Sequence, residues 1–383
     1  MPQDSQPSDS LAALIARRIR PDVRAMQAYA VQDASGMLKL DAMENPFSLA
    51  PPLQAALGQR LGAVALNRYP GARVELLRHA LANHAGMPTG HALMLGNGSD
   101  ELISLLALVC AVPRDAVTGA KPVVLAPVPG FVMYAVSAQL QGLDFVGVPL
   151  TTDFALDTAA MLQAIRVHQP ALVYLAYPNN PTANLWDADA MDAIVAAAAE
   201  VGSLVVVDEA YQPFASRSYM DLIVAQPQRH AHVLLLRTLS KFGLAGVRLG
   251  YLMGCSELIA EIDKVRPPYN ISVLNTECAL FALEHAAVFA AQAHEIVAER
   301  ARLQQAFAAL PGLQAFPSEA NMILLRLHGA GDRATSVFEA LKARGILVKN
   351  VSKMHPLLGN CLRITVGTAA ENAQLLLALQ EIL

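Results

Sequence analysis

Three short segments of the chain carry residue types that could do chemistry together. Residues 96–101 read Gly-Asn-Gly-Ser-Asp-Glu, and backbone amides that converge at a helix start can bind a phosphate. Residues 208–211 read Asp-Glu-Ala-Tyr, so an acid directly follows the apolar run 204–207. Residues 238–241 read Thr-Leu-Ser-Lys, and Arg248 follows the lysine after a short glycine-rich stretch. The three segments offer an anion site, a buried carboxylate and an amine.

Each segment also has an ordinary structural interpretation. The glycine loop could be only a helix start capped by Ser99 or Asp100, ahead of an apolar helix over 101–112. Asp208 could cap a helix or bind magnesium, and most lysines keep a solvated charge at the surface. Lys241, however, lies among apolar residues, where desolvation favours the neutral amine that attacks aldehydes.

The combination fits one small molecule, pyridoxal phosphate. This cofactor needs an amine for its aldehyde, a carboxylate for its ring nitrogen and hydrogen-bond donors for its phosphate. Lys241 would supply the amine and Asp208 the carboxylate. Ser240 and Arg248 would add two phosphate donors to those of the 96–101 loop.

Three further features fit this site but also fit ordinary structure. Asn180 lies in the segment Tyr-Pro-Asn-Asn-Pro-Thr over 177–182, which could be only a turn after a strand. Phe131 is either a core residue or the ring that stacks on the cofactor. Arg363 is a charge inside the strand-like run 361–366 and could receive an α-carboxylate, although a structural ion pair is commoner.

Short apolar strands alternating with helices would position these residues. Helices are predicted over 157–168 and 187–201, and strands over 122–126, 171–176, 203–207, 232–236 and 247–253. This alternation predicts an α/β fold with a mainly parallel central sheet between helices. Ligands bind at the carboxyl ends of such strands, which is where Asp208 and Lys241 fall.

The pattern changes after Tyr269. Long helical segments over 274–310 are followed by a helix around 337–343 and strands over 322–327, 345–349 and 361–366. This predicts a smaller α+β domain. We expect an N-terminal arm that joins the small domain over 1–45, a large cofactor-binding domain over 46–284 and the small C-terminal domain over 285–383.

Composition narrows the classes of function. The 383 residues have a formal net charge of −4 and no basic run, which argues against nucleic acid binding. The longest apolar run, 102–112, is shorter than the ~18 residues of a membrane helix. Arginines follow the apolar residues 11–16, the reverse of a signal peptide. The four cysteines are scattered and the histidines form no metal-type cluster, so we expect a cytoplasmic protein without a metal site.

In the order and spacing of these segments, the chain resembles the class I/II pyridoxal-phosphate aminotransferases, nearly end to end from about Val23. The matching segments are 40–46, 67–70, 96–101, 179–182, 208–211, 238–241 with 243–248, and 361–368. The resemblance implies the fold of that family, called fold type I, with a large domain around a mainly parallel sheet and a smaller α+β domain. It also implies a homodimer with shared active sites.

The resemblance further implies a role for each matching residue. Lys241 would hold the cofactor and move a proton between substrate and cofactor, Asp208 would pair with the ring nitrogen, and Phe131 would stack on the ring. Asn180 and Tyr211 would hydrogen-bond the ring oxygen. The residues that would contact the cofactor phosphate are Gly98, Ser99, Asp100, Ser240, Arg248 and, from the other subunit, Tyr69.

Within the family, the chain is similar to members that act on histidinol phosphate. Arg363 matches a carboxylate-binding arginine, Asn45 lies in a segment that lines the same pocket, and Tyr29 matches a tyrosine that helps to bind the substrate phosphate. Lys349 stands where the family often has a phosphate-binding arginine, and lysine keeps the charge without the planar fork. Phe131 replaces the usual tyrosine and so lacks its hydroxyl.

These matches predict reversible amino transfer between histidinol phosphate and 2-oxoglutarate, giving imidazole-acetol phosphate and glutamate, in histidine biosynthesis. One alternative is an aromatic amino acid aminotransferase for phenylalanine or tyrosine, which phosphate dependence of kcat/KM would distinguish. Another is a pyridoxal-phosphate-dependent decarboxylase of a phosphorylated amino acid, which would release CO₂ without a keto acid. A non-catalytic pyridoxal-binding regulator is disfavoured by the presence of Lys241, Asp208 and Arg363.

Overall fold

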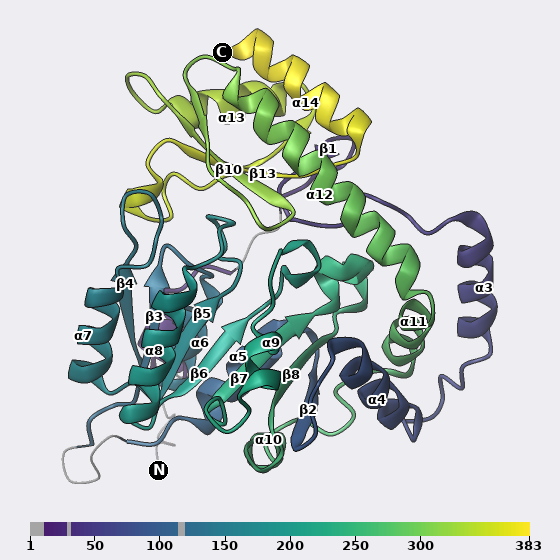
Figure 1. Cartoon of the computed structure of the whole chain (residues 1–383), viewed down its shortest axis with the longest axis vertical. Helices are drawn as coiled ribbons and strands as arrows, with labels where there is room; N and C mark the ends of the chain where they lie inside the picture. The colour runs from purple at the N-terminus through teal and green to yellow at the C-terminus, as the bar shows by residue number, and fades with distance from the viewer. Residues whose placement is uncertain (1–10, 29–31, 114–118) are drawn as a thin grey trace, which may run out of the picture. The chain divides into compact units, whose positions relative to one another are not determined.

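The computed structural model describes residues 11–28, 32–113 and 119–383, and Figure 1 shows the chain. The chain divides into a first unit that ends at Ser35 and a second unit over Gly36–Leu383. The first unit holds α1 (Leu11–Arg18), which has no buried residue, and α2 (Pro21–Ala25). All site residues discussed below except Tyr29 belong to the second unit.

A seven-stranded sheet forms the centre of the second unit. Its order is β2-β8-β7-β6-β5-β3-β4, and β8 alone runs antiparallel to its neighbours. The strands are β2 (His91–Gly96), β3 (Val123–Val128), β4 (Asp144–Pro149), β5 (Leu172–Ala176), β6 (Leu204–Asp208), β7 (Val233–Thr238) and β8 (Gly250–Cys255). The prediction of a mainly parallel sheet between helices is therefore confirmed, while β2 and β4 are strands that the sequence analysis did not identify.

Alternate residues of the central strands face two hydrophobic layers. In β6, Val205 and Val207 pack into one layer and Val206 into the other. The helices that bury side chains in the first layer are α4 (Arg73–Ala85), α7 (Thr158–His168), α8 (Ala188–Glu200), α9 (Met220–Ala225) and α11 (Val273–Glu284). Those in the second are α5 (Gly98–Val109), α6 (Met133–Gln141) and α10 (Ser256–Asp263). Burial on both faces explains why the strand sequences are almost continuously apolar.

A smaller antiparallel sheet carries the C-terminal strands. Its order is β12-β13-β10-β9, and its strands are β9 (Leu313–Ala315), β10 (Met322–Leu327), β12 (Lys349–Asn350) and β13 (Cys361–Thr365). A separate parallel pair joins β1 (Leu38–Lys39) to β11 (Ile346–Leu347). The segment that opens the second unit thus joins the C-terminal region through strand pairing. A division into large and small domains at residue 285 stays a prediction.

Two helices pack against strands of the smaller sheet, α12 (Ala286–Ala308) and α13 (Arg333–Ala343), and α14 (Ala369–Ile382) packs against both of them. Helix α3 (Pro51–Gly62) packs near α11. In Figure 1 the smaller sheet and α14 lie above the central sheet, and α12 runs down toward α11. No single helix among the described residues is long and apolar enough to cross a membrane. Together, α11 and α12 pass that test of length and composition only as a pair bent by 75°.

The strand expected over 345–349 is divided into two short strands, β11 and β12, which belong to different sheets. Two predicted boundaries next to the site are also wrong. The helix expected over 101–112 begins at Gly98, and its cap position is Asn97, without a side-chain cap bond, rather than Ser99 or Asp100. The strand expected over 247–253 begins only at Gly250. Arg248 has a left-handed backbone (φ 53°), which a continuous strand does not allow. This turn lets its guanidinium reach the Asp100 carboxylate at 3.3 Å.

Candidate active site

The carboxyl ends of four strands lie at one edge of the central sheet. β6 ends on Asp208, and β7 ends on Thr238, shortly before Lys241. β5 is followed by the segment that holds Asn180. β2 is antiparallel to β8, which is antiparallel to β7, so β2 also ends at this edge, with Gly96 leading into the glycine loop. The topology brings segments more than 100 residues apart to one place.

A pocket opens at this edge. The predicted cofactor residues that line it are Ser99, Asp100, Phe131, Asn180, Asp208, Tyr211, Ser240, Lys241 and Arg248. The other lining residues are Met43, Tyr134, Ala176, Pro178, Ala210 and Thr238. The segments of the sequence prediction therefore meet around a single cavity.

Lys241 lies in a short π-helical turn, Ser240–Leu244, directly after β7. Its Nζ donates a hydrogen bond to the Ala42 carbonyl at 3.1 Å and lies 5.9 Å from the centre of the Tyr211 ring. Burial, together with the charge of nearby Arg363, lowers the pKa of Lys241 to about 8. The amine is therefore neutral in a large fraction of molecules near pH 8, as a nucleophile must be.

Asp208 is buried beneath the pocket. Its two oxygens accept hydrogen bonds from the Tyr134 hydroxyl at 2.7 Å and the Ala210 amide at 3.0 Å. Burial raises the pKa of Asp208 to about 6, and the hydrogen bond from Tyr134 opposes that rise. Burying the charged carboxylate costs free energy, and a cationic partner in the pocket would offset that cost.

A row of hydrogen bonds connects Arg363 to Tyr211. Arg363 Nη1 donates to Asn180 Oδ1 at 2.7 Å, and Asn180 Nδ2 donates to the Tyr211 hydroxyl at 3.1 Å. Arg363 Nη2 also donates to the Asp41 carbonyl at 2.8 Å. Arg363 is only 7% exposed, so its charge is held close to the pocket although it does not line it. The positive charge of the Arg363 guanidinium therefore lies near the Lys241 amine and helps to lower its pKa.

The glycine loop is closely packed. A Cβ on Gly98, where φ is 77°, would lie 2.6 Å from Arg248 Nη2, and one on Gly250 would lie 2.7 Å from the Ser99 nitrogen. Only glycine therefore allows the loop to lie against β8 with the guanidinium beside it. The backbone N–H of Ser240 donates a hydrogen bond to Thr238 Oγ1 at 3.1 Å, which fixes the position of Ser240. The result is a cradle of amides and a cation at a helix start.

These observations fit pyridoxal phosphate. The glycine positions leave a cradle that a Cβ would fill, and the amine of lowered pKa lines the same cavity as the buried carboxylate. Phe131 borders this cavity and meets the Tyr134 ring edge-on, with ring centres 5.6 Å apart. An amine, a carboxylate, an aromatic ring and phosphate donors are the groups that the cofactor requires.

Glu209, next to Asp208, has a different environment. It is 1% exposed and accepts hydrogen bonds from Arg237 Nε at 2.9 Å and from the Ser218 hydroxyl at 3.0 Å. It does not line the pocket. In this acidic pair, one residue faces the cavity and the other forms a buried ion pair that ties β6 to β7.

Five of the predicted residues that the structure describes do not line this pocket: Gly98, Tyr69, Asn45, Lys349 and Arg363. The Asn45 amide bonds Gln292 Oε1 at 2.9 Å and lies beside Gly243. Lys349 pairs with Arg363 across neighbouring strands, and Tyr69 is 77% exposed in another part of the second unit. Tyr29 lies outside the described residues, so its predicted role stays a prediction.

Sequence reasoning missed several lining residues, of which Tyr134 is the most informative. It is buried, hydrogen-bonds Asp208 and stacks on Tyr174 with ring centres 4.2 Å apart. Its position three residues after Phe131, at the start of α6, was the available signal. Met43 also lines the pocket and lies only two residues before Asn45.

Comparison with known proteins identifies relatives over nearly the whole chain. The family model described as aminotransferase class I and II matches residues 35–379. A curated protein from Paracidovorax citrulli (strain AAC00-1), named histidinol-phosphate aminotransferase, is 64% identical over 374 residues, which cover 97% of this chain and 99% of that protein. The sequence similarity therefore covers nearly the whole length of both chains.

Solved structures agree on the fold. Histidinol-phosphate aminotransferase from Sinorhizobium meliloti, in complex with pyridoxal-5'-phosphate, has a TM-score of 0.82 at 26% identity and covers 95% of this chain and 97% of its own. L-threonine-O-3-phosphate decarboxylase from Porphyromonas gingivalis has a TM-score of 0.71 at 19% identity, with coverage of 90% and 99%. The fold alone therefore does not separate amino transfer from decarboxylation.

Proposed function

The chain belongs to the class I and II aminotransferases, and we propose that it transfers an amino group between histidinol phosphate and 2-oxoglutarate, giving imidazole-acetol phosphate and glutamate in histidine biosynthesis. The observation that carries this proposal is the 64% identity to a histidinol-phosphate aminotransferase over nearly the full length of both chains. Pyridoxal phosphate is the cofactor of this family, and the pocket fits it.

When bound, pyridoxal phosphate supplies an aldehyde that receives amines and a ring that draws electrons from the substrate Cα. Lys241 would hold the cofactor through Nζ, and the same amine is placed to take and return the proton of the substrate Cα. Its pKa of about 8 suits a group that must accept and return a proton near neutral pH. Asp208 would keep the ring nitrogen protonated, and Tyr134 holds the Asp208 carboxylate in place through its hydrogen bond.

Two cations favour an anionic substrate. Lys349 and Arg363 are directly opposed across β12 and β13, so their side chains leave the same face of the smaller sheet. Glutamate carries two carboxylates and histidinol phosphate carries a phosphate, so each would meet positive charge there. We propose that Arg363 binds the carboxylate, with Asn45 near that pocket, and that Lys349 together with Tyr29 binds the phosphate.

This assignment predicts strong discrimination by the substrate phosphate. Histidinol phosphate should react with a kcat/KM at least about 10³-fold above that of phenylalanine or of dephosphorylated histidinol, because a charge-pairing site rejects an analogue without the charge. Lys349→Met should lower kcat/KM for histidinol phosphate by about 10–100-fold, as expected for a lost charge-assisted hydrogen bond, while Lys349→Arg should keep most of it. Stopped-flow single turnovers with each donor measure these values. Equal rates with phenylalanine would assign the chain to aromatic amino acids, and CO₂ release without a keto acid would indicate a decarboxylase.

We further propose a homodimer in which Tyr69 contacts the cofactor phosphate of the partner subunit. Tyr69 is 77% exposed and lies outside the pocket of its own chain. It stacks on Tyr269, which is 57% exposed, with ring centres 4.4 Å apart. Leu66 is also largely exposed on the same segment. Two aromatic rings held together at a surface provide a rigid apolar contact for a second copy.

Mixed dimers test this shared site. Lys241→Ala and Tyr69→Ala subunits should each be impaired alone, whereas mixing them should restore about one quarter of the wild-type sites, since half of the dimers then hold one intact site. The measurement is aminotransferase activity after subunit exchange at limiting cofactor. Activity no greater than that of the Tyr69→Ala protein in the mixture would show that Tyr69 serves its own chain.

A cytoplasmic location completes the proposal. Cys110, Cys255, Cys278 and Cys361 are all free thiols, as is usual in a reducing compartment.

A further inference from the structure

The phosphate cradle begins at a turn that has no side-chain cap of its own. Asn97 occupies the cap position of α5, and its side chain makes no cap bond. Gly98 follows with a left-handed backbone and is the first residue of the helix. Such a turn leaves the orientation of the next amides dependent on its surroundings. The backbone amide of Asn97 is fixed, because its N–H donates a hydrogen bond to Glu101 Oε2 at 2.7 Å.

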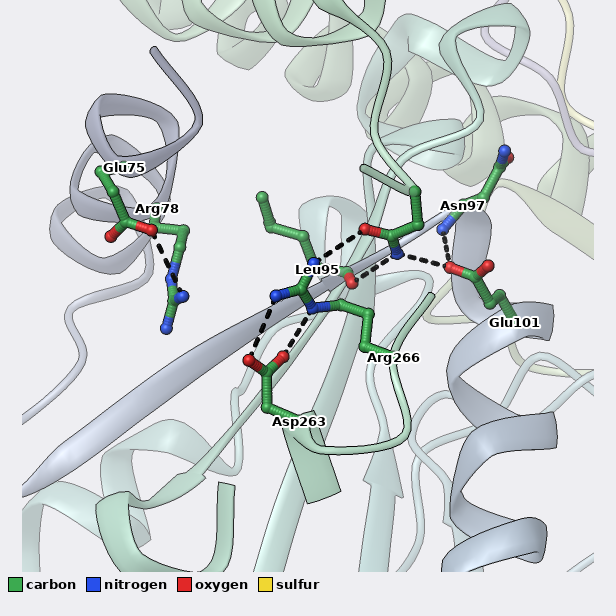
Figure 2. A network of polar contacts seen from close by, with 8 residues as sticks. Glu75, Arg78, Leu95, Asn97, Glu101, Asp263 and Arg266 are labelled. Carbon is green, nitrogen blue, oxygen red and sulfur yellow. Dashed lines mark hydrogen bonds and ion pairs between the residues drawn. The ribbon is translucent and has the colours of Figure 1, made fainter. Parts of the chain in front are cut away.

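A chain of polar contacts extends from this turn to α10 (Figure 2). Glu101 Oε2 also accepts a hydrogen bond from Asn270 Nδ2 at 2.7 Å. Asn270 Oδ1 accepts from Arg266 Nη1 at 3.2 Å. Arg266 is in turn held by Asp263, with Nε to Oδ1 at 2.6 Å and Nη2 to Oδ2 at 3.1 Å. All contacts except the one to Asn97 are between side chains, and the four side chains that make them are partly buried.

Asn270 uses its whole amide in this arrangement. Besides the Glu101 carboxylate, Nδ2 donates to the Leu95 carbonyl at 3.1 Å, so both donor hydrogens and the acceptor have partners. Leu95 is the residue of β2 just before Gly96. The single side chain of Asn270 therefore ties the end of β2 to the first turn of α5, the two sides of the glycine turn.

We propose that Asn270 and Glu101 are positioning residues that set the phosphate cradle and thereby the affinity for the cofactor phosphate. Neither residue lines the pocket, so they act through the Asn97–Gly98 turn. The inference rests on the proposed function, because it takes the phosphate of pyridoxal phosphate as the ligand of the cradle. It assigns a role to the segment 266–270, which holds none of the phosphate-binding residues named above.

Cofactor titrations of the full-length chain, stripped of cofactor, test this role. Pyridoxal phosphate and pyridoxal, which lacks the phosphate, are each titrated by absorbance into the wild type and the variants. Asn270→Leu and Glu101→Ala should each raise the Kd for pyridoxal phosphate about tenfold, as expected for the loss of one charge-assisted hydrogen bond. The Kd for pyridoxal should stay within about twofold, because pyridoxal has no phosphate for the cradle to bind. Glu101→Gln keeps an oxygen that can accept both bonds and should stay within about threefold of the wild type.

Two further measurements separate positioning from general damage. Glu261→Gln alters the exposed Glu261–Lys264 pair on α10, which makes no contact with Asn270, and should change neither Kd. The double variant Asn270→Leu/Glu101→Ala should be little worse than the poorer single variant, because both residues act through one contact. The ³¹P NMR shift of the bound phosphate should move in the two disruptive variants but not in Glu101→Gln.

The outcomes are distinct for the two proposals. Equal losses for pyridoxal phosphate and pyridoxal, or no loss for either, would overturn the positioning role of Asn270 and Glu101. A wild-type protein that binds pyridoxal phosphate no tighter than pyridoxal would instead overturn the phosphate cradle, and with it the proposed function.

Discussion

Replacing Lys241 with alanine should abolish amino transfer, lowering kcat by about 10⁴-fold or more, since the variant loses both the nucleophile and the proton carrier. Among the described residues that line the pocket, Lys241 alone carries an amine. Borohydride treatment followed by mass spectrometry should attach the cofactor to the wild-type chain at residue 241 and to no residue of the variant. Turnover and a captured cofactor in Lys241→Ala would contradict the mechanism.

The pH dependence and a matched control sharpen this result. Only the neutral amine attacks an aldehyde, and the pKa of Lys241 is lowered to about 8, so capture of pyridoxal phosphate by the stripped protein should speed up as pH rises, with a midpoint near 8. A midpoint near 10.5, the ordinary lysine value, would show that burial does not lower the pKa of this amine.

A matched control is Lys342→Ala, at an exposed lysine on α13, which should leave capture and turnover unchanged. A small added amine should restore part of the rate of Lys241→Ala.

Replacing Asp208 with asparagine should lower kcat by about 10³-fold, the size of effect seen when one preorganised electrostatic group is removed from an active site. Asparagine fits the space, and its single carbonyl oxygen can accept from the Ala210 amide while its amide nitrogen donates to the Tyr134 hydroxyl, but it has no charge to keep a ring nitrogen protonated. Asp208→Glu keeps the charge and should lose less activity. An Asp208→Asn protein with more than about one tenth of the wild-type kcat would remove Asp208 from the mechanism.

The same substitution should stabilise the cofactor-free chain. Burial raises the folded pKa of Asp208 from 3.8 to about 6, so the ionised carboxylate destabilises the folded state above about pH 6, and this cost disappears below about pH 4. Asp208→Asn should therefore raise the free energy of unfolding at pH 7 by up to about 3 kcal/mol and have little effect near pH 4. Thermal unfolding at the two pH values measures the difference. Lost activity with gained stability is the signature of a functional rather than a structural residue.

Local sequence was sufficient for most of the site because the key residues sit at conspicuous places. Asp208 interrupts apolar residues at a strand end, and Lys241 follows a strand among apolar neighbours, where charge is costly without a function. The strands themselves were recognisable since both of their faces are buried. The glycine loop was equally readable, although its helix begins three residues earlier than predicted. The strand expected over 247–253 failed at its start because the backbone of Arg248 turns left-handed to meet Asp100, a contact between distant segments.

The sequence by itself determined the alternating α/β architecture, the family and the amine, carboxylate and phosphate donors, since each of these is encoded in a run of neighbouring residues. Only the tertiary structure showed the role of the adjacent Glu209, which pairs with Arg237 of β7 instead of facing the pocket. It alone placed Tyr134 under Asp208, opposed Lys349 to Arg363, and joined Asn270 to the glycine turn. These relationships depend on strand order, register and loop path. Tyr134 and Asp208 are 74 positions apart and Glu101 and Asn270 are 169 apart, so no local pattern encodes these contacts.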